Sequence, residues 1–274
     1  MNDVMIKTAE WIMKSEYAIA LTGAGMSTES GIPDFRGPDG LWTKNPEAEK
    51  QAYQSYFKFQ KNPKAYWSER LTGVSPWGQW LKATPNPGHF ALAELENMGM
   101  LKCVITQNID NLHQKAKSRR VLDYHGNLSL LRCFSCNTRF QSVEYDLERL
   151  LVEDRLPPIC RKCQGILKSD VVHFNEPIPE DIARESREEV ARCDLMLICG
   201  TSATVYPFAM LPRIAKQKVD RIKTVIIEIN AHPTPLTQEG ISDIFIQGKT
   251  GVVLTEILDA VKEISRGTPK KYID

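Results

Sequence analysis

Short apolar segments alternate along the chain with longer segments of helical periodicity. Six apolar segments predict strands, at residues 17–22, 102–106, 121–124, 195–200, 224–229 and 244–247. Several are nearly continuous in Val, Ile, Leu or Met, which is typical of strands covered on both faces. Helical spacing separates them at residues 4–13, 89–97, 182–191, 209–216 and 252–265. This alternation predicts an α/β fold with a doubly wound parallel sheet.

Two stretches interrupt this alternation. Residues 38–87 are rich in aromatic side chains, Pro and Gln, and short helices are expected there over 46–60 and 63–71. Residues 127–176 contain two Cys-x-x-Cys motifs. Both stretches are expected to be insertions that together form a smaller domain. The sheet domain would then consist of residues 1–37, 88–126 and 177–274.

Composition narrows the function classes. The formal net charge of the 274 residues is +1, so no global charge favours binding to nucleic acid or to a membrane surface. No apolar stretch approaches the roughly 18 residues that a membrane span requires. The first residues alternate apolar and charged side chains, a pattern of an amphipathic helix and not of a secretion signal. We therefore expect a cytoplasmic protein without membrane association or direct nucleic-acid binding.

The cysteine spacing predicts a metal site. Cys133 and Cys136 form one pair, Cys160 and Cys163 form the other, and 23 residues separate the pairs. Two such pairs can close a tetrahedral shell around a structural zinc ion, with no position left for a catalytic water. A helix expected over residues 145–153 accounts for the long gap. The alternatives are a redox dithiol, which lacks its usual sequence context here, and a nucleic-acid-binding zinc ribbon.

The end of the first predicted strand carries a candidate phosphate-binding turn. Gly23 and Gly25 follow the strand, and such glycines let a backbone approach a phosphate closely. The third position of the usual dinucleotide fingerprint is Thr28 in place of glycine. No acidic residue follows at the end of a second strand, where a ribose ligand usually lies. The turn therefore departs from the ordinary dehydrogenase pattern.

Three further polar motifs follow predicted strands. They are the segments 106–110 (Thr-Gln-Asn-Ile-Asp), 124–126 (Tyr-His-Gly) and 200–202 (Gly-Thr-Ser). Taken alone, Asn108 or Asp110 could cap a helix, and His125 could be a structural histidine. The unperturbed pKa of histidine, about 6.5, also suits a general base near neutrality.

These motifs, in this order, together with the segment 20–37 and the cysteine pairs, resemble the sirtuins, the NAD-dependent protein deacylases. The resemblance covers residues 16–264. It implies a Rossmann-like NAD-binding domain with a smaller zinc-binding and helical domain inserted. It also implies NAD as co-substrate, structural zinc, and acyl-lysine proteins or peptides as substrates.

The resemblance assigns roles to individual residues. The implied catalytic residues are His125, Asn108 and Asp110, with His125 activating a ribose hydroxyl during acyl transfer to ADP-ribose. Phe35 would cover the nicotinamide ribose. The implied NAD-contacting residues are Gly23, Ala24, Gly25, Ser27, Thr28, Asp34, Phe35, Arg36, Gln107, Asn108, Ile109, Asp110, Gly200, Thr201, Ser202, Asn230 and Thr250.

Substrate is expected to bind as an extended strand between two loops. The implied contacts are Val172, His173, Phe174, Asn175, Val205 and Tyr206. Asn175 replaces the glycine that is usual in the family, and asparagine tolerates positive φ better than most residues. His173 is either an exposed loop residue or one that alters substrate choice. Glu69 lies where relatives that prefer acidic acyl groups carry an arginine, so we expect acetyl or longer apolar acyl groups.

The function expected from the sequence is therefore NAD-dependent protein-lysine deacylation, most simply deacetylation with release of nicotinamide. Two alternatives remain at this point. One is mono-ADP-ribosyl transfer at the same site, and the other is a non-catalytic NAD-sensing or zinc-ribbon binding module.

Overall fold

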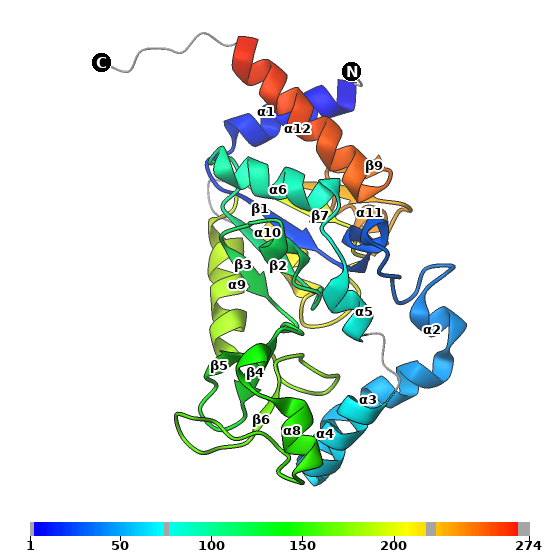
Figure 1. Cartoon of the computed structure of the whole chain (residues 1–274). Coiled ribbons are helices and arrows are strands. Elements are labelled where there is room, and N and C mark those ends of the chain that lie inside the picture. The colour runs from blue at the N-terminus through cyan, green and yellow to red at the C-terminus, as the bar shows by residue number, and fades with distance from the viewer. Residues whose placement is uncertain (1–2, 74–76, 218–222, 268–274) are drawn as a thin grey trace.

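The computed structural model describes residues 3–73, 77–217 and 223–267. Its main element is a six-stranded parallel sheet in the order β3-β2-β1-β7-β8-β9 (Figure 1). The strands are β1 (Ala18–Thr22), β2 (Cys103–Thr106), β3 (Val121–Asp123), β7 (Leu195–Cys199), β8 (Val225–Asn230) and β9 (Ile244–Gln247). All six predicted strands are confirmed. The order reverses between β1 and β7, as in a doubly wound sheet.

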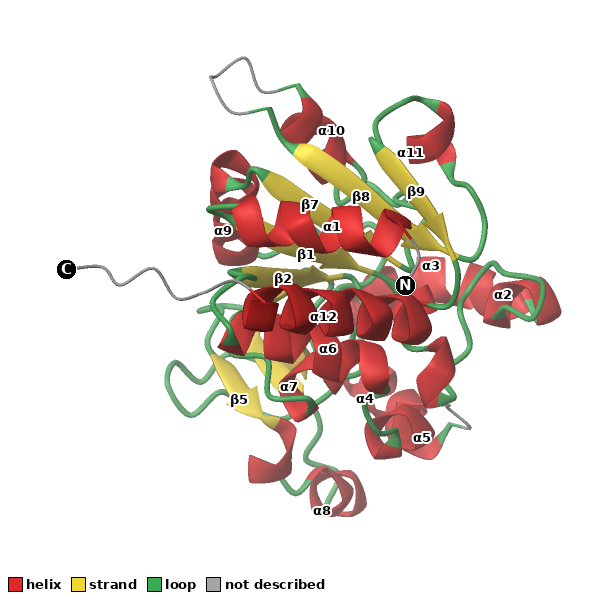
Figure 2. Cartoon of the chain, turned by 90° about the horizontal axis from the view of Figure 1, so that it is seen from above, coloured by secondary structure: helices red, strands yellow, loops and turns green. Residues whose placement is uncertain are grey.

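Helices cover both faces of this sheet (Figure 2). One group consists of α1 (Asp3–Lys14), α6 (Pro87–Asn97) and α12 (Thr250–Gly267), whose apolar sides share a core cluster with β1, β7 and β8. The other group consists of α9 (Glu180–Arg192), α10 (Met210–Lys216) and α11 (Pro235–Gln238), which contribute to a second cluster. The five helices predicted from periodicity are confirmed. Cys103, Cys193 and Cys199 are buried in this sheet domain.

A second, antiparallel sheet has the order β5-β4-β6. Its strands are β4 (Leu130–Cys133), β5 (Arg139–Gln141) and β6 (Leu167–Ser169), and α8 (Leu147–Val152) confirms the helix predicted between the cysteine pairs. The sequence did not predict this sheet, because strands of three or four residues carry no clear alternation. We call residues 127–176 the cysteine module.

The segment rich in aromatic residues packs on the cysteine module. It forms α2 (Leu41–Lys44), α3 (Pro46–Lys61), α4 (Pro63–Thr72) and α5 (Trp77–Lys82), of which α3 and α4 confirm the expected helices. Phe59 and Trp67 share a core cluster with Leu131 and Leu167 of the small sheet. The Trp67 indole N–H also donates to the Leu167 carbonyl over 2.9 Å. The helical segment and the cysteine module therefore lie side by side, as Figure 1 shows.

The remaining elements are single turns, which periodicity cannot detect. They are α7 (Leu112–Lys115) and the 3₁₀ turns η1 (Ala24–Met26), η2 (Thr28–Ser30) and η3 (Ser142–Glu144). Among the described residues, no helix has the length and apolar character needed to cross a membrane.

Candidate functional site

The turns that follow β1 and β7 touch each other through their backbones. The Gly25 N–H donates to the Gly200 carbonyl over 2.8 Å. Gly200 has φ +62°, and a Cβ there would lie 2.3 Å from the Met26 nitrogen. Only glycine fits this position, because both the conformation and the space exclude a side chain. The two strand ends are thereby held at one point of the carboxyl edge of the sheet.

The end of β2 joins this point through side-chain amides. Asn108 Nδ2 donates to the Gly23 carbonyl over 2.9 Å and to Ser27 Oγ over 3.0 Å. Gln107 Nε2 donates to Thr201 Oγ1 over 2.6 Å. The turns after β1, β2 and β7 therefore form one hydrogen-bonded polar cluster, at the edge where open parallel sheets bind ligands.

Asp110 is buried within this cluster. Its carboxylate accepts from Ser27 Oγ over 2.7 Å and from the Leu112 N–H over 2.9 Å. Burial raises the pKa of this carboxyl, while the hydrogen bonds from Ser27 and Leu112 lower it. One oxygen thus accepts from the first amide of α7, but the N-cap of this helix is Asn111, so the helix-capping alternative is wrong for Asn108 and Asp110. The other oxygen is tied to Ser27 of the first turn.

His125 follows β3 at the same edge. Burial lowers the pKa of its imidazole to about 4, against a smaller upward effect of a hydrogen bond with the Gln107 backbone. The ring is therefore neutral near pH 7, the form that accepts a proton. Gly126 has φ +78°, and a Cβ there would lie 2.0 Å from the Asp170 carbonyl oxygen. This close approach fixes the chain directly after His125.

Sequence reasoning missed a chain of hydrogen bonds beneath Asn108. The Asn108 N–H donates to Thr106 Oγ1 over 3.0 Å, and Thr22 Oγ1 donates to the same oxygen over 2.8 Å. His113 Nε2 lies 3.0 Å from Thr22 Oγ1. The signal in the sequence was a hydroxyl at the last position of two apolar strands. Because all three side chains are buried, they fix the backbone that carries Asn108.

The other candidate NAD-contacting residues from β7, β8 and α12 lie around the same turns. Asn230 Nδ2 donates to the Thr201 carbonyl over 3.1 Å. Thr250 Oγ1 and Thr28 Oγ1 donate to the Gly25 carbonyl over 3.3 and 3.0 Å. Ser202 is exposed and its hydroxyl lies 3.1 Å from that of Thr204. Ala24 is half-buried in η1.

Residues 34–36 connect this region to the helical segment. Asp34 Oδ1 accepts from the Gly37 N–H over 2.9 Å. The Phe35 ring centroid lies 4.6 Å from that of Trp42. Phe35 and Ile109 both pack against an apolar cluster that includes Leu112. Arg36 is exposed, stacks over Trp42 at 4.5 Å and pairs with a glutamate of α3.

The two candidate substrate loops differ in their surroundings. Asn175 has φ +65°, so the expected positive-φ turn is confirmed. Phe174 stacks on Tyr53 with ring centroids 4.2 Å apart. His173 Nε2 lies 2.8 Å from the Tyr66 hydroxyl and the ring is partly buried, so the exposed-loop alternative for His173 is wrong. In the second loop Val205 is half-buried and Tyr206 is exposed.

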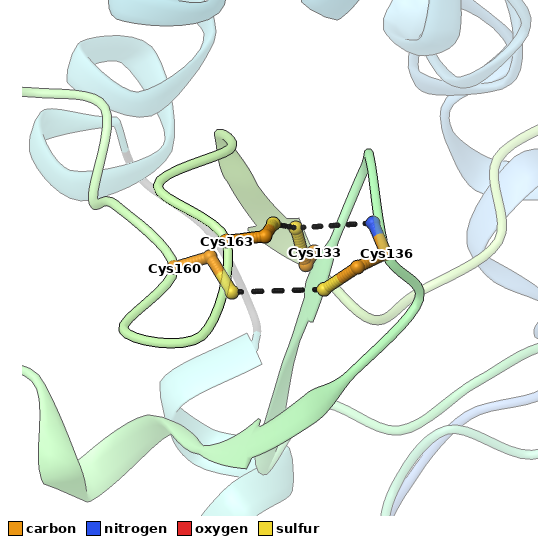
Figure 3. Close-up of side chains that lie close together, drawn as sticks. All are labelled: Cys133, Cys136, Cys160 and Cys163. Atoms are coloured by element: carbon orange, nitrogen blue, oxygen red, sulfur yellow. Dashed lines mark hydrogen bonds between the residues drawn. The ribbon is translucent and has the colours of Figure 1, made fainter.

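The four cysteines of the cysteine module come together. Figure 3 shows their side chains turned toward one another, and all four Sγ atoms lie within 4.8 Å of each other. Two of the Sγ–Sγ distances are 3.4 and 3.8 Å. Four thiolates about 2.3 Å from a central zinc ion would lie about 3.8 Å apart. The cluster therefore fits a structural zinc site, as the spacing predicted.

Comparison with known proteins places this geometry in a family. The model of the Sir2 family matches residues 23–207. The NAD-dependent protein deacylase of Thermococcus kodakarensis is 43% identical over 259 residues, covering 93% of this chain and 95% of that protein. A solved complex of a Sir2 homologue with NAD is 40% identical with a TM-score of 0.74, covering 96% of this chain and 95% of that one.

A second solved structure extends the comparison to a peptide complex. A Sir2 protein with a deacetylated p53 peptide and 3′-O-acetyl ADP-ribose is 33% identical with a TM-score of 0.73. It covers 95% of this chain and 98% of that one. The similarity thus extends over nearly the whole chain, and the chain belongs to the Sir2 family.

Proposed function

We propose that this protein is an NAD-dependent protein-lysine deacylase and acts as a deacetylase. The main support for this proposal is the polar cluster at the carboxyl edge, where Ser27 is hydrogen-bonded to both Asn108 and Asp110 and His125 lies on the same edge. The names of the relatives, NAD-dependent protein deacylase and deacetylase, support the same activity.

The donor set at this edge suits a dinucleotide. Backbone amides of the turn after β1 and the hydroxyl of Thr201 suit the phosphates, since such turns favour anions. Asn230 would contact the adenine-side ribose, and the backbone of Thr250 would contact the adenine. Asn108, Ile109 and Asp110 would recognise the nicotinamide ribose and carboxamide. Phe35 and Arg36 would close over the cofactor from the helical side.

His125 supplies the base in this proposal. The overall reaction converts acyl-lysine, NAD and water into lysine, nicotinamide and O-acyl-ADP-ribose. The lowered pKa of His125, about 4, leaves its imidazole free to accept the proton of a ribose hydroxyl at neutral pH. Asn108, held by the turn after β1 and by Thr106, would orient the ribose and the attacking water.

The acyl-lysine peptide would lie between residues 172–175 and residues 205–206, paired through its backbone. The structure of a relative with a p53 peptide supports a peptide substrate. Glu69 is exposed and pairs with Lys58 over 2.9 Å, so the side chain at that position is an anion, which disfavours an acidic acyl group. We therefore propose acetyl or apolar acyl groups as substrates.

The proposal also assigns the domains. Residues 1–37, 88–126 and 177–274 would form the NAD-binding domain, and residues 38–87 with 127–176 the smaller domain. Zinc held by the four cysteines would stabilise the smaller domain and take no part in the reaction, because four thiolates leave no open position. The cytoplasmic location and the lack of nucleic-acid binding expected from the sequence remain predictions.

Mass spectrometry of an acetyl-lysine peptide incubated with the protein, with and without NAD, tests this function. We expect NAD-dependent loss of the acetyl group with O-acetyl-ADP-ribose formed, and neither with the His125→Ala variant. Addition of ADP-ribose to the peptide would instead establish mono-ADP-ribosyl transfer. Binding of NAD without any change in acetyl and longer apolar acyl peptides would indicate a sensor.

A further inference from the structure

The small antiparallel sheet places two buried cations side by side. Arg132 on β4 lies directly opposite Lys168 on β6 in the strand register. Lys168 is only 1% exposed and Arg132 is also buried. Like charges opposite each other on neighbouring strands repel, and a buried unpaired charge is strongly unfavourable. This pair therefore requires anions from elsewhere in the fold.

Two buried carboxylates supply them, both from the segment that follows β6. Asp170 accepts from Arg132 Nε over 2.9 Å. Glu176 accepts from Arg132 Nη2 over 2.6 Å, and its other oxygen lies 3.1 Å from Lys168 Nζ. Arg139 joins at the rim, 3.3 Å from Asp170. Glu176 is thus the carboxylate that bridges the two buried cations.

All three N–H donors of the Lys168 ammonium have partners in residues 169–176. A protonated lysine has three N–H donors. Those of Lys168 are directed to the Ser169 carbonyl over 2.7 Å, to the Val171 carbonyl and to Glu176. Burial lowers the pKa of Lys168 to about 8, with Glu176 opposing the shift, so the ammonium is mostly protonated at neutral pH. The result is a clamp of Lys168 and Glu176 around residues 169–176.

The clamped segment contains the proposed substrate loop, residues 172–175. The Val172 N–H donates to the His125 carbonyl over 2.8 Å, which ties the loop to the residue proposed as the base. Glu176 closes the turn, because its carboxylate accepts from the His173 N–H over 3.0 Å. Its own N–H donates to the His173 carbonyl over 3.1 Å. The clamp therefore fixes the backbone that would pair with a peptide.

We infer that Lys168, acting through Glu176, is a positioning residue for the peptide substrate. It holds residues 169–176 in the conformation that pairs with an extended acyl-lysine peptide, and it does not act on NAD. The separation follows from the layout: the candidate NAD contacts lie in residues 34–36, at the ends of β1, β2, β7 and β8 and at the start of α12, whereas Lys168 lies on β6 of the small sheet. The inference rests on the proposed function and deepens it.

Three variants test the inference through binding and kinetics. Lys168→Met removes the charge and all three donors at similar volume, Lys168→Arg keeps the charge, and Lys64→Met is the control. Lys64 of α4 forms an exposed pair with Asp154 of the cysteine module over 2.7 Å. For Lys168→Met we expect the Kd and KM of an acetyl-lysine peptide to rise about tenfold, or about 1.4 kcal/mol. The kcat and the KM for NAD of Lys168→Met should change little. Lys168→Arg should recover part of the lost peptide affinity, and Lys64→Met should match the wild type.

Hydrogen exchange read by mass spectrometry supplies a readout independent of activity. In Lys168→Met, amides of residues 169–176 should exchange faster while those of β2 and β7 stay protected. Unchanged exchange in 169–176, or an equal loss of peptide and NAD binding, would overturn the inference. A wild-type protein that fails to deacetylate would contradict the proposed function, and the exchange data would still decide whether Lys168 orders the loop. If Lys168→Met does not fold, Glu176→Gln takes its place, because it weakens the clamp at constant size. Glu176→Gln must then weaken peptide binding while kcat and the KM for NAD change little.

Discussion

The two sheets of this molecule are stabilised in different ways. In the parallel sheet, β1, β2 and β7 are buried along their whole length and are covered by helices on both faces. In the small sheet each strand has three or four residues, and β5 has no buried residue. Four cysteines and a group of buried ion pairs supplement a small apolar cluster there. Apolar burial therefore stabilises the strands that lead to the proposed NAD site, while discrete polar contacts stabilise the proposed substrate loop.

Removal of the metal should unfold the small sheet and leave the parallel sheet folded, and we expect this to be the largest difference between the two. Binding of a structural zinc ion contributes about 10–16 kcal/mol to folding. The cysteine module should therefore unfold in a Cys160→Ser variant or after a chelator removes the metal. Hydrogen exchange should show protection lost over residues 130–133 and 167–169 and retained over 195–199. Cys193→Ala is the control, because this buried cysteine lies in the sheet domain. A zinc-free protein that keeps β4 and β6 protected would contradict the metal's structural role.

Loss of the proposed base should have the opposite character, a large effect on rate with a small one on folding. For His125→Ala we expect kcat to fall about 10²–10⁴-fold, the usual contribution of a general base. The thermal midpoint should stay near that of the wild type. His232→Ala, which alters an exposed histidine, should keep full activity. An active His125→Ala variant would remove His125 from the mechanism.

Loss of a buried ion pair in the small sheet should destabilise the protein more than loss of an exposed one. Arg132→Met should lower the free energy of unfolding by about 3–5 kcal/mol, because it leaves Asp170 and Glu176 with fewer partners in a buried site. Arg149→Met is the matched control, since its pair with Glu153 is exposed. Urea titration measures both variants. Equal stability of the two would show that the buried pairs matter no more than surface ones.

A pH titration probes the sheet domain. Burial lowers the pKa of His89 to about 4, below the roughly 6.5 of an unfolded chain. The unfolded state then binds more protons between these values, so stability falls as pH falls from 6.5 to 4, by up to about 1.4 kcal/mol per pH unit. Asp123 acts oppositely, because burial raises the pKa of its carboxyl to about 6. Stability from its neutral form is lost as pH rises toward 6.

Comparison with His89→Asn isolates the histidine from these other groups. Asparagine can still accept the hydrogen bond that the Asn86 N–H makes to His89 over 3.3 Å. The variant's stability, measured by urea titration at several pH values, should decline less steeply below pH 6.5 than that of the wild type. Parallel curves would mean that His89 titrates normally in the fold.

The features that could be predicted from the sequence are those with a local signal along the chain. The six parallel strands were predictable, because buried strands produce continuous apolar runs. The metal site was predictable from the spacing of its four cysteines. The positive φ of Asn175 was predictable because the residue stands in a position that is usually glycine in the family.

What the sequence did not reveal consists of contacts between distant polar residues. Arg132 and Glu176 are 44 positions apart, and neither shows that it will be buried. The chain from His113 through Thr22 and Thr106 to Asn108 likewise joins three separate elements. His173 was open to an exposed reading because nothing near it in sequence indicates Tyr66 as a partner. Such contacts depend on tertiary packing and leave no periodic signal.

A crystal structure of the protein with NAD tests the central claim most directly. We expect the phosphates at the turns after β1 and β7, and the nicotinamide beside Asn108 and Asp110 with its ribose near His125. The four cysteines of the metal site should make no contact with the reacting atoms. NAD bound elsewhere, or a ribose far from His125, would contradict the account.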